Sequence, residues 1–220
     1  MKTLALIAQK GGAGKTTIAV NLAVAAAEVQ VALFDLDPQE SAVIWSDRRK
    51  TESPHVEFLT ERRLPDALKA AQEQGFVLSI IDTPPAAGPQ AYTAAQSADL
   101  VLIPCRLSLI DLEAIRRTAQ LIKSVGVCAF VVFNAAPPSA TTLLEDARAI
   151  VEGTGLTVAP VVLRERGVYR AVWPLGQAVS EFEPRGKASQ EIANLKNWVF
   201  AQLNMCISEP VQEGEVLSHG

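Results

Sequence analysis

The stretch QKGGAGKTT, residues 9–17, decides how the rest of the chain is interpreted. It follows a short apolar run and precedes a segment with apolar residues at helical spacing. A glycine-rich loop between a strand and a helix is typical of phosphate-binding loops, whose usual pattern is G-x-x-x-x-G-K-[ST]. Two features depart from that pattern. Gln9 stands where the first glycine is expected, and a second lysine, Lys10, precedes the expected Lys15.

The residues of this loop have separate expected roles in binding a phosphate chain. Its glycines allow backbone angles that turn amide groups toward phosphate oxygens, and the following helix adds the positive end of its dipole. Lys15 is expected to reach the β and γ phosphates, Thr16 to bind Mg²⁺, and Thr17 to bind an α-phosphate oxygen. We therefore predict a nucleotide site formed by Lys10, Gly11, Gly12, Ala13, Gly14, Lys15, Thr16 and Thr17. The alternative is a glycine-rich turn with ordinary surface lysines.

Apolar runs and helical patterns alternate along most of the chain. The strand-like runs cover residues 3–8, 31–35, 56–59, 77–82, 99–104, 127–134 and 156–163. The helical patterns cover residues 15–28, 39–50, 64–74, 89–97, 110–125, 140–152, 165–173 and 186–204. This alternation predicts an α/β fold, a mostly parallel twisted sheet with helices on both faces. Ligands of such sheets bind at the carboxyl ends of the strands, where the motifs described below fall.

Length and composition indicate one globular domain. The chain has 220 residues, of which 49% are hydrophobic, and this suffices for a single sizeable core. We expect one phosphate-loop domain over residues 1–206 and a disordered acidic tail over residues 207–220. The net charge of −4 does not indicate nucleic-acid binding by the surface as a whole. Neither a signal peptide nor an apolar run of about 18 residues is visible, which predicts a cytoplasmic protein.

The three cysteines, Cys105, Cys128 and Cys206, are far apart and show no C-x-x-C spacing. The first two lie in apolar strand-like runs, so we expect buried free thiols in a reducing compartment. The only histidines are His55 and His219, which leaves a histidine and cysteine metal site with little support.

Aspartates stand at the ends of two predicted strands. Asp35 and Asp37 end the second strand, and Pro38 then turns the chain away. From these residues alone, a helix N-cap and turn is an open interpretation of the pair. Asp82 ends the fourth strand, where phosphate-loop proteins place a carboxylate that holds Mg²⁺, usually through a water. A chance turn is the alternative for Asp82.

Two segments carry a family resemblance. KGGAGKTT resembles the deviant phosphate loop K-G-G-x-G-K-[ST] of the ParA/MinD family of ATPases, and DLDPQ, residues 35–39, resembles the family's D-x-D-P-Q segment. The family does not require the first glycine, so Gln9 ceases to be a departure. The resemblance implies ATP and Mg²⁺ as ligands and a homodimer in the ATP state. In that dimer Lys10 crosses the interface and contacts phosphate on the facing subunit, whereas the residue alone would also fit a solvated lysine.

The resemblance also implies roles for residues at other strand ends. Asp37 helps to position or activate the attacking water, so the expected catalytic residues are Lys10, Lys15 and Asp37. Asp35 supports the Mg²⁺ and loop network. Asn134, at the end of the sixth strand, sits where the family reads adenine, although a strand-ending asparagine before prolines is also a common turn. Asp111 is expected to cap its helix.

The region from residue 164 to residue 187 has a modest basic bias. Its basic residues are Arg164, Arg166, Arg170, Arg185 and Lys187. Composition alone also fits a solvated, salt-bridged surface. In ParA-like proteins the equivalent region binds DNA non-specifically in the ATP dimer, so the resemblance implies DNA binding by these five residues. Such binding would fall steeply with salt.

The resemblance covers about residues 1–204 and favours the short partition ATPases. The loop begins at residue 9 without a preceding helix-turn-helix, and the tail lacks the basic amphipathic helix of membrane-bound relatives. We therefore expect a nucleoid-associated ATPase of plasmid or chromosome partition, stimulated by a ParB-like partner and without membrane binding. Three alternatives remain: a cargo-positioning or conjugation-accessory ATPase, a membrane or septum positioning ATPase, and a metabolic enzyme that activates a carboxylate with ATP.

Overall fold

The computed structural model describes residues 1–86 and 88–205. The expected acidic tail over residues 207–220 and the thiol of Cys206 lie outside this described part, and the expected end of the domain remains a prediction.

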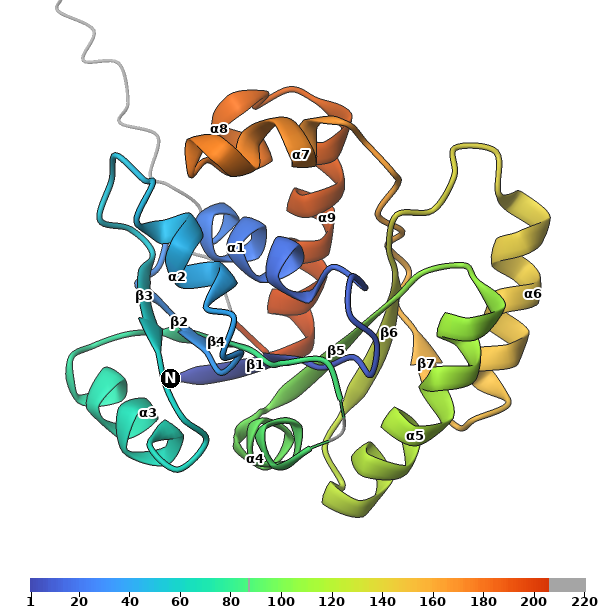
Figure 1. Ribbon diagram of the computed structural model, residues 1–220, viewed down its shortest axis with the longest axis horizontal. Helices are drawn as coiled ribbons and strands as arrows, with labels where there is room; N and C mark the ends of the chain where they lie inside the picture. Colours follow the sequence, from blue (N-terminus) through green and yellow to red (C-terminus); the bar gives the residue numbers. More distant parts are fainter. Residues whose placement is uncertain (87, 206–220) are drawn as a thin grey trace, which may run out of the picture.

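One sheet forms the centre of the described chain (Figure 1). Its order is β3-β2-β4-β1-β5-β6-β7, and every paired strand runs parallel to its neighbours. The strands are β1 (Lys2–Leu6), β2 (Val31–Asp35), β3 (His55–Phe58), β4 (Leu78–Asp82), β5 (Leu100–Cys105), β6 (Ala129–Phe133) and β7 (Thr157–Val158). The predicted α/β fold is confirmed. Because β1 lies between β4 and β5, the loop that follows it opens at the middle of the sheet edge.

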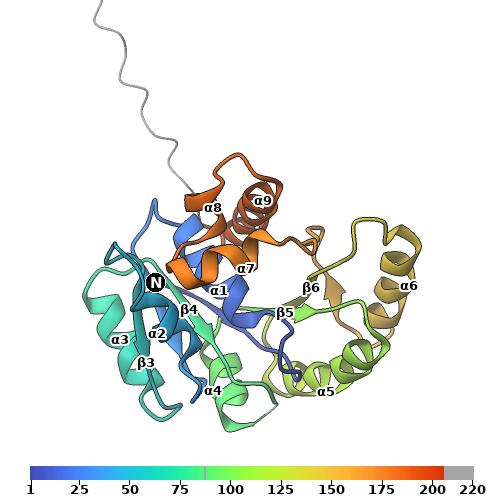
Figure 2. The same cartoon turned by 45° about the horizontal axis from the view of Figure 1, so that its top comes forward.

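Helices cover both faces of the sheet (Figures 1 and 2). On one face lie α1 (Lys15–Ala25), α2 (Ser41–Ser46), α7 (Val168–Val172), the short 3₁₀ helix η1 (Trp173–Leu175), α8 (Val179–Phe182) and α9 (Lys187–Gln202). On the other lie α3 (Leu64–Glu73), α4 (Pro89–Ser97), α5 (Leu109–Val125) and α6 (Thr141–Glu152).

The strand residues alternate between these two layers, as the pleat of a strand requires. In β1, Leu4 and Leu6 pack with the core under α1 and α9, whereas Ala5 and the following Ile7 pack with the core under α3 to α6. All four side chains are almost completely buried, with at most 1% of their surface exposed. The sheet is thus covered on both faces, which explains why its strands are continuously apolar in sequence.

Two local predictions hold only in part, and the predicted burial of Cys128 was wrong. The strand expected over residues 156–163 pairs only at β7, because Pro160 cannot donate to the ladder. Beyond it the chain still follows β6, with Leu163 donating to the Phe133 carbonyl at 2.9 Å. The helix expected over residues 165–173 is limited to α7 and continues as η1, and α8 was not predicted. Cys105 is buried as expected, but Cys128 is exposed because it precedes β6 and does not belong to it.

Candidate nucleotide-binding site

The phosphate loop lies between β1 and α1, as its sequence predicts. Gly12 and Gly14 have φ angles of 76° and 97°, in the left-handed region that favours glycine. A Cβ atom on Gly14 would also lie 2.1 Å from Nδ2 of Asn134. Gly14 is the N-cap of α1 and no side chain caps this helix, so the first amide groups remain available for an anion.

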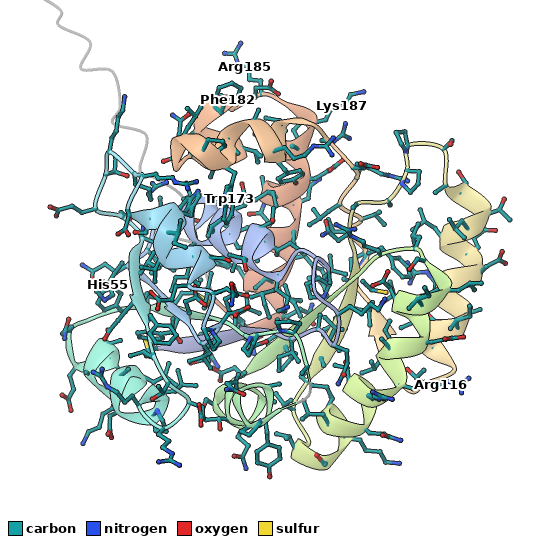
Figure 3. All side chains as sticks on the ribbon, in the orientation of Figure 1. His55, Arg116, Trp173, Phe182, Arg185 and Lys187 are labelled. Atoms are coloured by element: carbon teal, nitrogen blue, oxygen red, sulfur yellow. The ribbon has the colours of Figure 1, made fainter. Side chains whose placement is uncertain are left out.

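An open cavity of about 480 Å³ adjoins this loop. It is bounded by the loop, by α2, by residues that follow β4, β5 and β6, and by the segment around α7. Its lining side chains include Lys15, Thr16, Asp37, Ser41, Arg106, Asn134, Arg164, Arg166, Tyr169, Arg170 and Trp173. This volume lies within the range of small-molecule and cofactor sites. The cavity therefore joins the phosphate loop to residues much later in the chain, such as Arg164 and Trp173. Figure 3 shows Trp173 between the α7 and α8 layer and α1.

Lys15 is the buried cation of this site. It opens α1 with 6% of its surface exposed. Burial lowers the pKa of its ammonium, and the negative charges of Asp82 and Asp37 oppose that shift. An ammonium held beside free helix amides is a strong point charge for phosphate oxygens.

Thr16 and Asp82 form the second polar element of the site. The Thr16 hydroxyl donates to Oδ2 of Asp82 at 2.5 Å, and Asp82 is completely buried. The other carboxylate oxygen, Oδ1, has no hydrogen-bond partner among the described residues. Burial raises the pKa of Asp82 to about 7, although the hydrogen bond from Thr16 opposes the shift.

A buried carboxylate oxygen without a partner is costly unless a cation or donor meets it. Mg²⁺ prefers oxygen ligands and takes only one or two of them from the protein in nucleotide sites. The residues present therefore fit Mg²⁺, with Thr16 and Asp82 holding it. The described residues contain no group of three or more histidine, cysteine, aspartate or glutamate side chains able to hold a metal ion.

Asp35 and Asp37 lie at the end of β2 but face different surroundings. Both oxygens of the buried Asp35 accept backbone hydrogen bonds at 2.9 Å, from the amides of Asp37 and Ala42. Asp35 thus shapes the turn into α2, and no contact in the structure supports its predicted role at Mg²⁺. Asp37 is partly exposed, lines the cavity, and accepts one bond from the Gln39 amide. This position suits the predicted role beside the attacking water, which remains a prediction.

Lys10 lies apart from the other loop residues. It does not line the large cavity. It lines a separate, very small one, with Cys105 and with Asp111 and Ala114 of α5. In this conformation Lys10 is therefore separate from the phosphate chain that its own loop would bind.

Asn134 contacts the phosphate loop directly. Its Nδ2 donates to the Ala13 carbonyl at 2.7 Å, which joins the end of β6 to the loop. This amide group is therefore engaged with the backbone, and the predicted reading of adenine by Asn134 would have to use its Oδ1.

The first turn of α5 matches the prediction for Asp111 in part. Ser108 is the N-cap, accepting from the Asp111 amide, and its hydroxyl donates to the Asp111 carboxylate. Asp111 therefore assists the cap from the first turn of the helix.

The five predicted DNA-binding residues are spread over the nucleotide cavity, a second cavity lined by both Arg166 and Lys187, and the segment around Arg185. Arg164, Arg166 and Arg170 line the nucleotide cavity. Arg164 donates to the Pro137 carbonyl at 2.8 Å, and Arg166 forms an ion pair with Glu191. Arg185 and Lys187 are exposed at the outer end of the connection between α8 and α9 (Figure 3). Their role in DNA binding remains a prediction.

Arg106, Tyr169 and Trp173 are among the cavity residues that sequence reasoning missed. Tyr169 lines the cavity, and its hydroxyl has no hydrogen-bond partner among the described residues. A local signal exists only for Arg106, which directly follows a predicted strand. The other two depend on the way the chain returns over α1 after β7.

A family comparison agrees with this geometry. The model of the CobQ/CobB/MinD/ParA nucleotide binding domain matches residues 4–172. The chain belongs to this family. The match includes the phosphate loop, both aspartate segments and α7, so most residues that line the cavity described above fall within the matched nucleotide binding domain. The predicted relation to ParA and MinD is confirmed.

The relatives described here are named for carboxysome distribution or are named ParA. The Maintenance of carboxysome distribution protein A of Halothiobacillus neapolitanus is 31% identical over 90% of this chain and 95% of its own length. Its namesake in Gloeobacter kilaueensis is 38% identical, over 54% of this chain and 56% of its own length. A protein named ParA from Rhizobium radiobacter is 27% identical over 91% of this chain and 96% of its own length.

Solved structures support the fold. An ATP complex of McdA from Cyanothece has a TM-score of 0.72 at 20% identity, covering 90% of this chain and 96% of the other.

Among the described helices, none combines the length and apolarity needed to cross a membrane.

Proposed function

We propose that this protein is a ParA-type ATPase whose ATP-bound homodimer binds DNA non-specifically and positions a cargo. The observation that carries the proposal is that the two lysines of the loop occupy different positions. Lys15 lines the large cavity, whereas Lys10 lines a separate small cavity beside α5. A cation placed there suits phosphate held by a facing subunit, which would make dimerisation depend on ATP.

The geometry suits hydrolysis with few protein groups. The loop amides and Lys15 hold the phosphate chain, and Thr16 with Asp82 would hold Mg²⁺. When bound, Mg²⁺ neutralises charge on the β and γ phosphates. Asp37 lies at the cavity wall, where its carboxylate would orient the attacking water. Loss of the γ phosphate removes what both lysines hold, and the dimer would then loosen.

The names of the relatives suggest two alternative kinds of cargo. A protein named for carboxysome distribution is 31% identical over 90% of this chain, and a chromosome partitioning protein is 28% identical over 57% of it. Partition of a plasmid or chromosome is the function we favoured from the sequence, and positioning of a protein-walled body is the alternative that these names support. In either case a ParB-like protein or a cargo adaptor would stimulate the hydrolysis of ATP. The ATPase itself would be associated with the nucleoid.

One assay tests the proposal. Electrophoretic mobility of arbitrary duplex DNA is measured with ATP, ADP or no nucleotide, at two salt concentrations. We expect retardation only with ATP, weakened by salt because phosphate contacts release counterions. The matched control is Lys15→Ala, which loses the buried cation and should give no retardation. Retardation that ignores the nucleotide, or none at all, would refute DNA binding as the output of the switch.

Sedimentation in saturating Mg-ATP tests the dimer separately. The Asp37→Ala variant should sediment as two chains with ATP and as one chain with ADP. If it stays a single chain in both, the role given to Lys10 is wrong.

A further inference from the structure

Arg106 is a cationic residue at the cavity, and the roles given above to Lys10 and Lys15 do not explain its presence there. It directly follows β5, whose end is held by β6 on one side: Pro104 and Cys105 pair with Val132 and Phe133. The Asn134 amide also donates to the Cys105 carbonyl at 2.8 Å. The backbone at Arg106 is therefore fixed at the edge of the sheet, while the residue itself is exposed.

The guanidinium of Arg106 lies over the phosphate loop. Its Nη2 is 4.0 Å from the point where a Cβ atom on Gly12 would stand. Arg106 lines the same cavity as Lys15 and Thr16. A group at this position lies beside Gly12, five residues before Thr17 in the loop. Since Thr17 is expected to bind the α-phosphate, we expect Arg106 to lie toward the terminal phosphate.

The other arginines of the cavity are differently engaged. Arg164 donates to a backbone carbonyl, and Arg166 pairs with Glu191. Within residues 1–86 and 88–205, Arg106 and Arg170 have neither an ion pair nor a side-chain hydrogen bond. Of these two, Arg106 is the one beside the glycine loop. Its five donors therefore face the cavity without a protein acceptor, and they match phosphate oxygens in pairs.

We propose that Arg106 is a phosphate-binding residue: its guanidinium contacts the terminal phosphate of the nucleotide held by the loop of the same chain. This inference rests on the proposed function only in requiring a nucleoside triphosphate as the ligand. It gives the site a cation within the chain that senses the γ phosphate, in addition to the lysine of a facing subunit. Nucleotides lacking that phosphate leave Arg106 without its partner.

Binding of AMP-PNP and of ADP, each with Mg²⁺, tests the contact in the full chain. The variants are Arg106→Gln, which removes the charge, and Arg106→Lys, which keeps it. For Arg106→Gln we expect affinity for AMP-PNP to fall roughly tenfold, the effect of one charge-assisted hydrogen bond, and affinity for ADP to fall less than about twofold. Arg106→Lys should lie between. The matched control is Arg116→Gln, an exposed arginine on α5 (Figure 3), which should bind both nucleotides as the unmodified protein does.

Three outcomes would overturn the proposal. Equal losses for AMP-PNP and ADP would place Arg106 away from the terminal phosphate, and no loss for either would remove it from the site. Repeating the titration over a hundredfold range of protein concentration separates the two sources of phosphate. A loss that disappears at low concentration would assign Arg106 to the nucleotide of a facing subunit. Melting without nucleotide should be unchanged in Arg106→Gln, because the side chain has no partner to lose.

These results are distinguishable from failure of the proposed function. If the unmodified protein retards DNA only with ATP while Arg106→Gln binds AMP-PNP normally, the function stands and only this inference falls. If Arg106→Gln loses AMP-PNP selectively while DNA is never retarded, the contact stands without the proposed output.

Discussion

Thr16 and Asp82 are hydrogen-bonded across the base of the phosphate loop, with 2.5 Å between the hydroxyl and Oδ2. The bond joins the first turn of α1 to the end of β4, two elements that are 66 residues apart in sequence. It leaves Oδ1 of Asp82 buried without a partner among the described residues. The protein thus keeps a buried carboxylate with one unpaired oxygen in its core, at a cost to stability that a bound cation would offset.

The first prediction follows from that cost. Asp82→Asn removes the buried charge while keeping a similar shape, so the nucleotide-free protein should become more stable by about 1 kcal/mol, or about 2–4 °C in melting temperature. The same change should weaken Mg²⁺-dependent ATP binding at least about tenfold. Melting curves and a Mg²⁺ titration of nucleotide binding measure the two effects.

Asp99→Asn is the matched control for this change. Asp99 is also an aspartate beside β1, but it accepts from the Thr3 amide at 2.7 Å and pairs with Lys2 near the surface. It should lose a little stability and leave the Mg²⁺ requirement unchanged. A lower melting temperature for Asp82→Asn would show that its charge is already satisfied in the free protein.

The second prediction concerns two glycines of the loop. Gly14→Ala should destabilise the protein by about 2 kcal/mol, because its φ of 97° is strained for alanine and the new Cβ would displace Asn134. Gly11→Ala should change the melting temperature very little, since nothing lies within 4 Å of its Cβ position and its φ is not in the left-handed region. Thermal melting without nucleotide compares the pair.

A double variant separates the two causes. Adding Asn134→Ala to Gly14→Ala removes the displaced side chain but not the backbone strain. The combined loss should therefore be smaller than the sum of the two single losses. Simple additivity would mean that Asn134 does not constrain Gly14.

The parts of this molecule that could be predicted from sequence are those encoded locally. The phosphate loop and the strand ends at Asp35 and Asp82 are adjacent in sequence to the elements that position them. The second strand was predicted with its observed bounds, residues 31–35, because an apolar run and a strand end coincide there. The strand predicted over residues 156–163 is longer than the observed β7, because the extended segment that contains Pro160 is also apolar in sequence.

What could not be predicted depends on the order of the strands and the path of the chain above the sheet. Arg106 is beside Gly12 only because β5 is the neighbour of β1. Trp173 reaches the cavity because α7 and η1 fold back over α1 after β7. Asn134 was expected at a ligand and also contacts the loop itself, which no feature of the sequence indicates.

The third prediction concerns Asp37, the partly exposed carboxylate of the cavity wall. Asp37→Ala should keep affinity for AMP-PNP within about threefold, because among the described residues its carboxylate accepts a hydrogen bond only from the Gln39 amide of its own turn. ATP hydrolysis should slow about a hundredfold, the typical loss when a water-positioning carboxylate is removed. Phosphate release at saturating ATP measures turnover. Asp47→Ala, at the exposed C-terminal end of α2, is the control that should hydrolyse normally, and unchanged turnover in Asp37→Ala would remove Asp37 from the reaction.

The fourth prediction concerns Arg49, which joins α2 to the segment of η1 and α8. The side chain of Arg49 is only 4% exposed, and its guanidinium pairs with both carboxylate oxygens of Glu181 at 2.8 and 3.0 Å. It also donates to the Gly176 carbonyl and lies 4.6 Å from the Trp45 ring centroid. Arg49→Met should therefore lower the free energy of unfolding by about 3 kcal/mol, because the carboxylate and the carbonyls lose a shared donor.

The pH dependence of this contact has a definite sign. Burial alone raises the pKa of Glu181, but the hydrogen bonds from Arg49 and from the Ala178 amide, together with the charge of Arg49, bring it below the usual value. A lowered carboxyl pKa stabilises the fold above the unfolded-state value of 4.5, and that stabilisation disappears as the pH falls through the lower folded value. The unmodified protein should therefore be more stable than Glu181→Gln at pH 7, by about 1 kcal/mol, and the difference should shrink below pH 4.5. Urea unfolding of both proteins across this range measures it. The control is Glu183→Gln, because Glu183 is a neighbouring exposed glutamate whose side chain forms no ion pair in the described chain. This variant should show no such pH-dependent difference. If the difference for Glu181→Gln stayed constant from pH 7 to pH 3, the charge of Glu181 would not hold the two segments together.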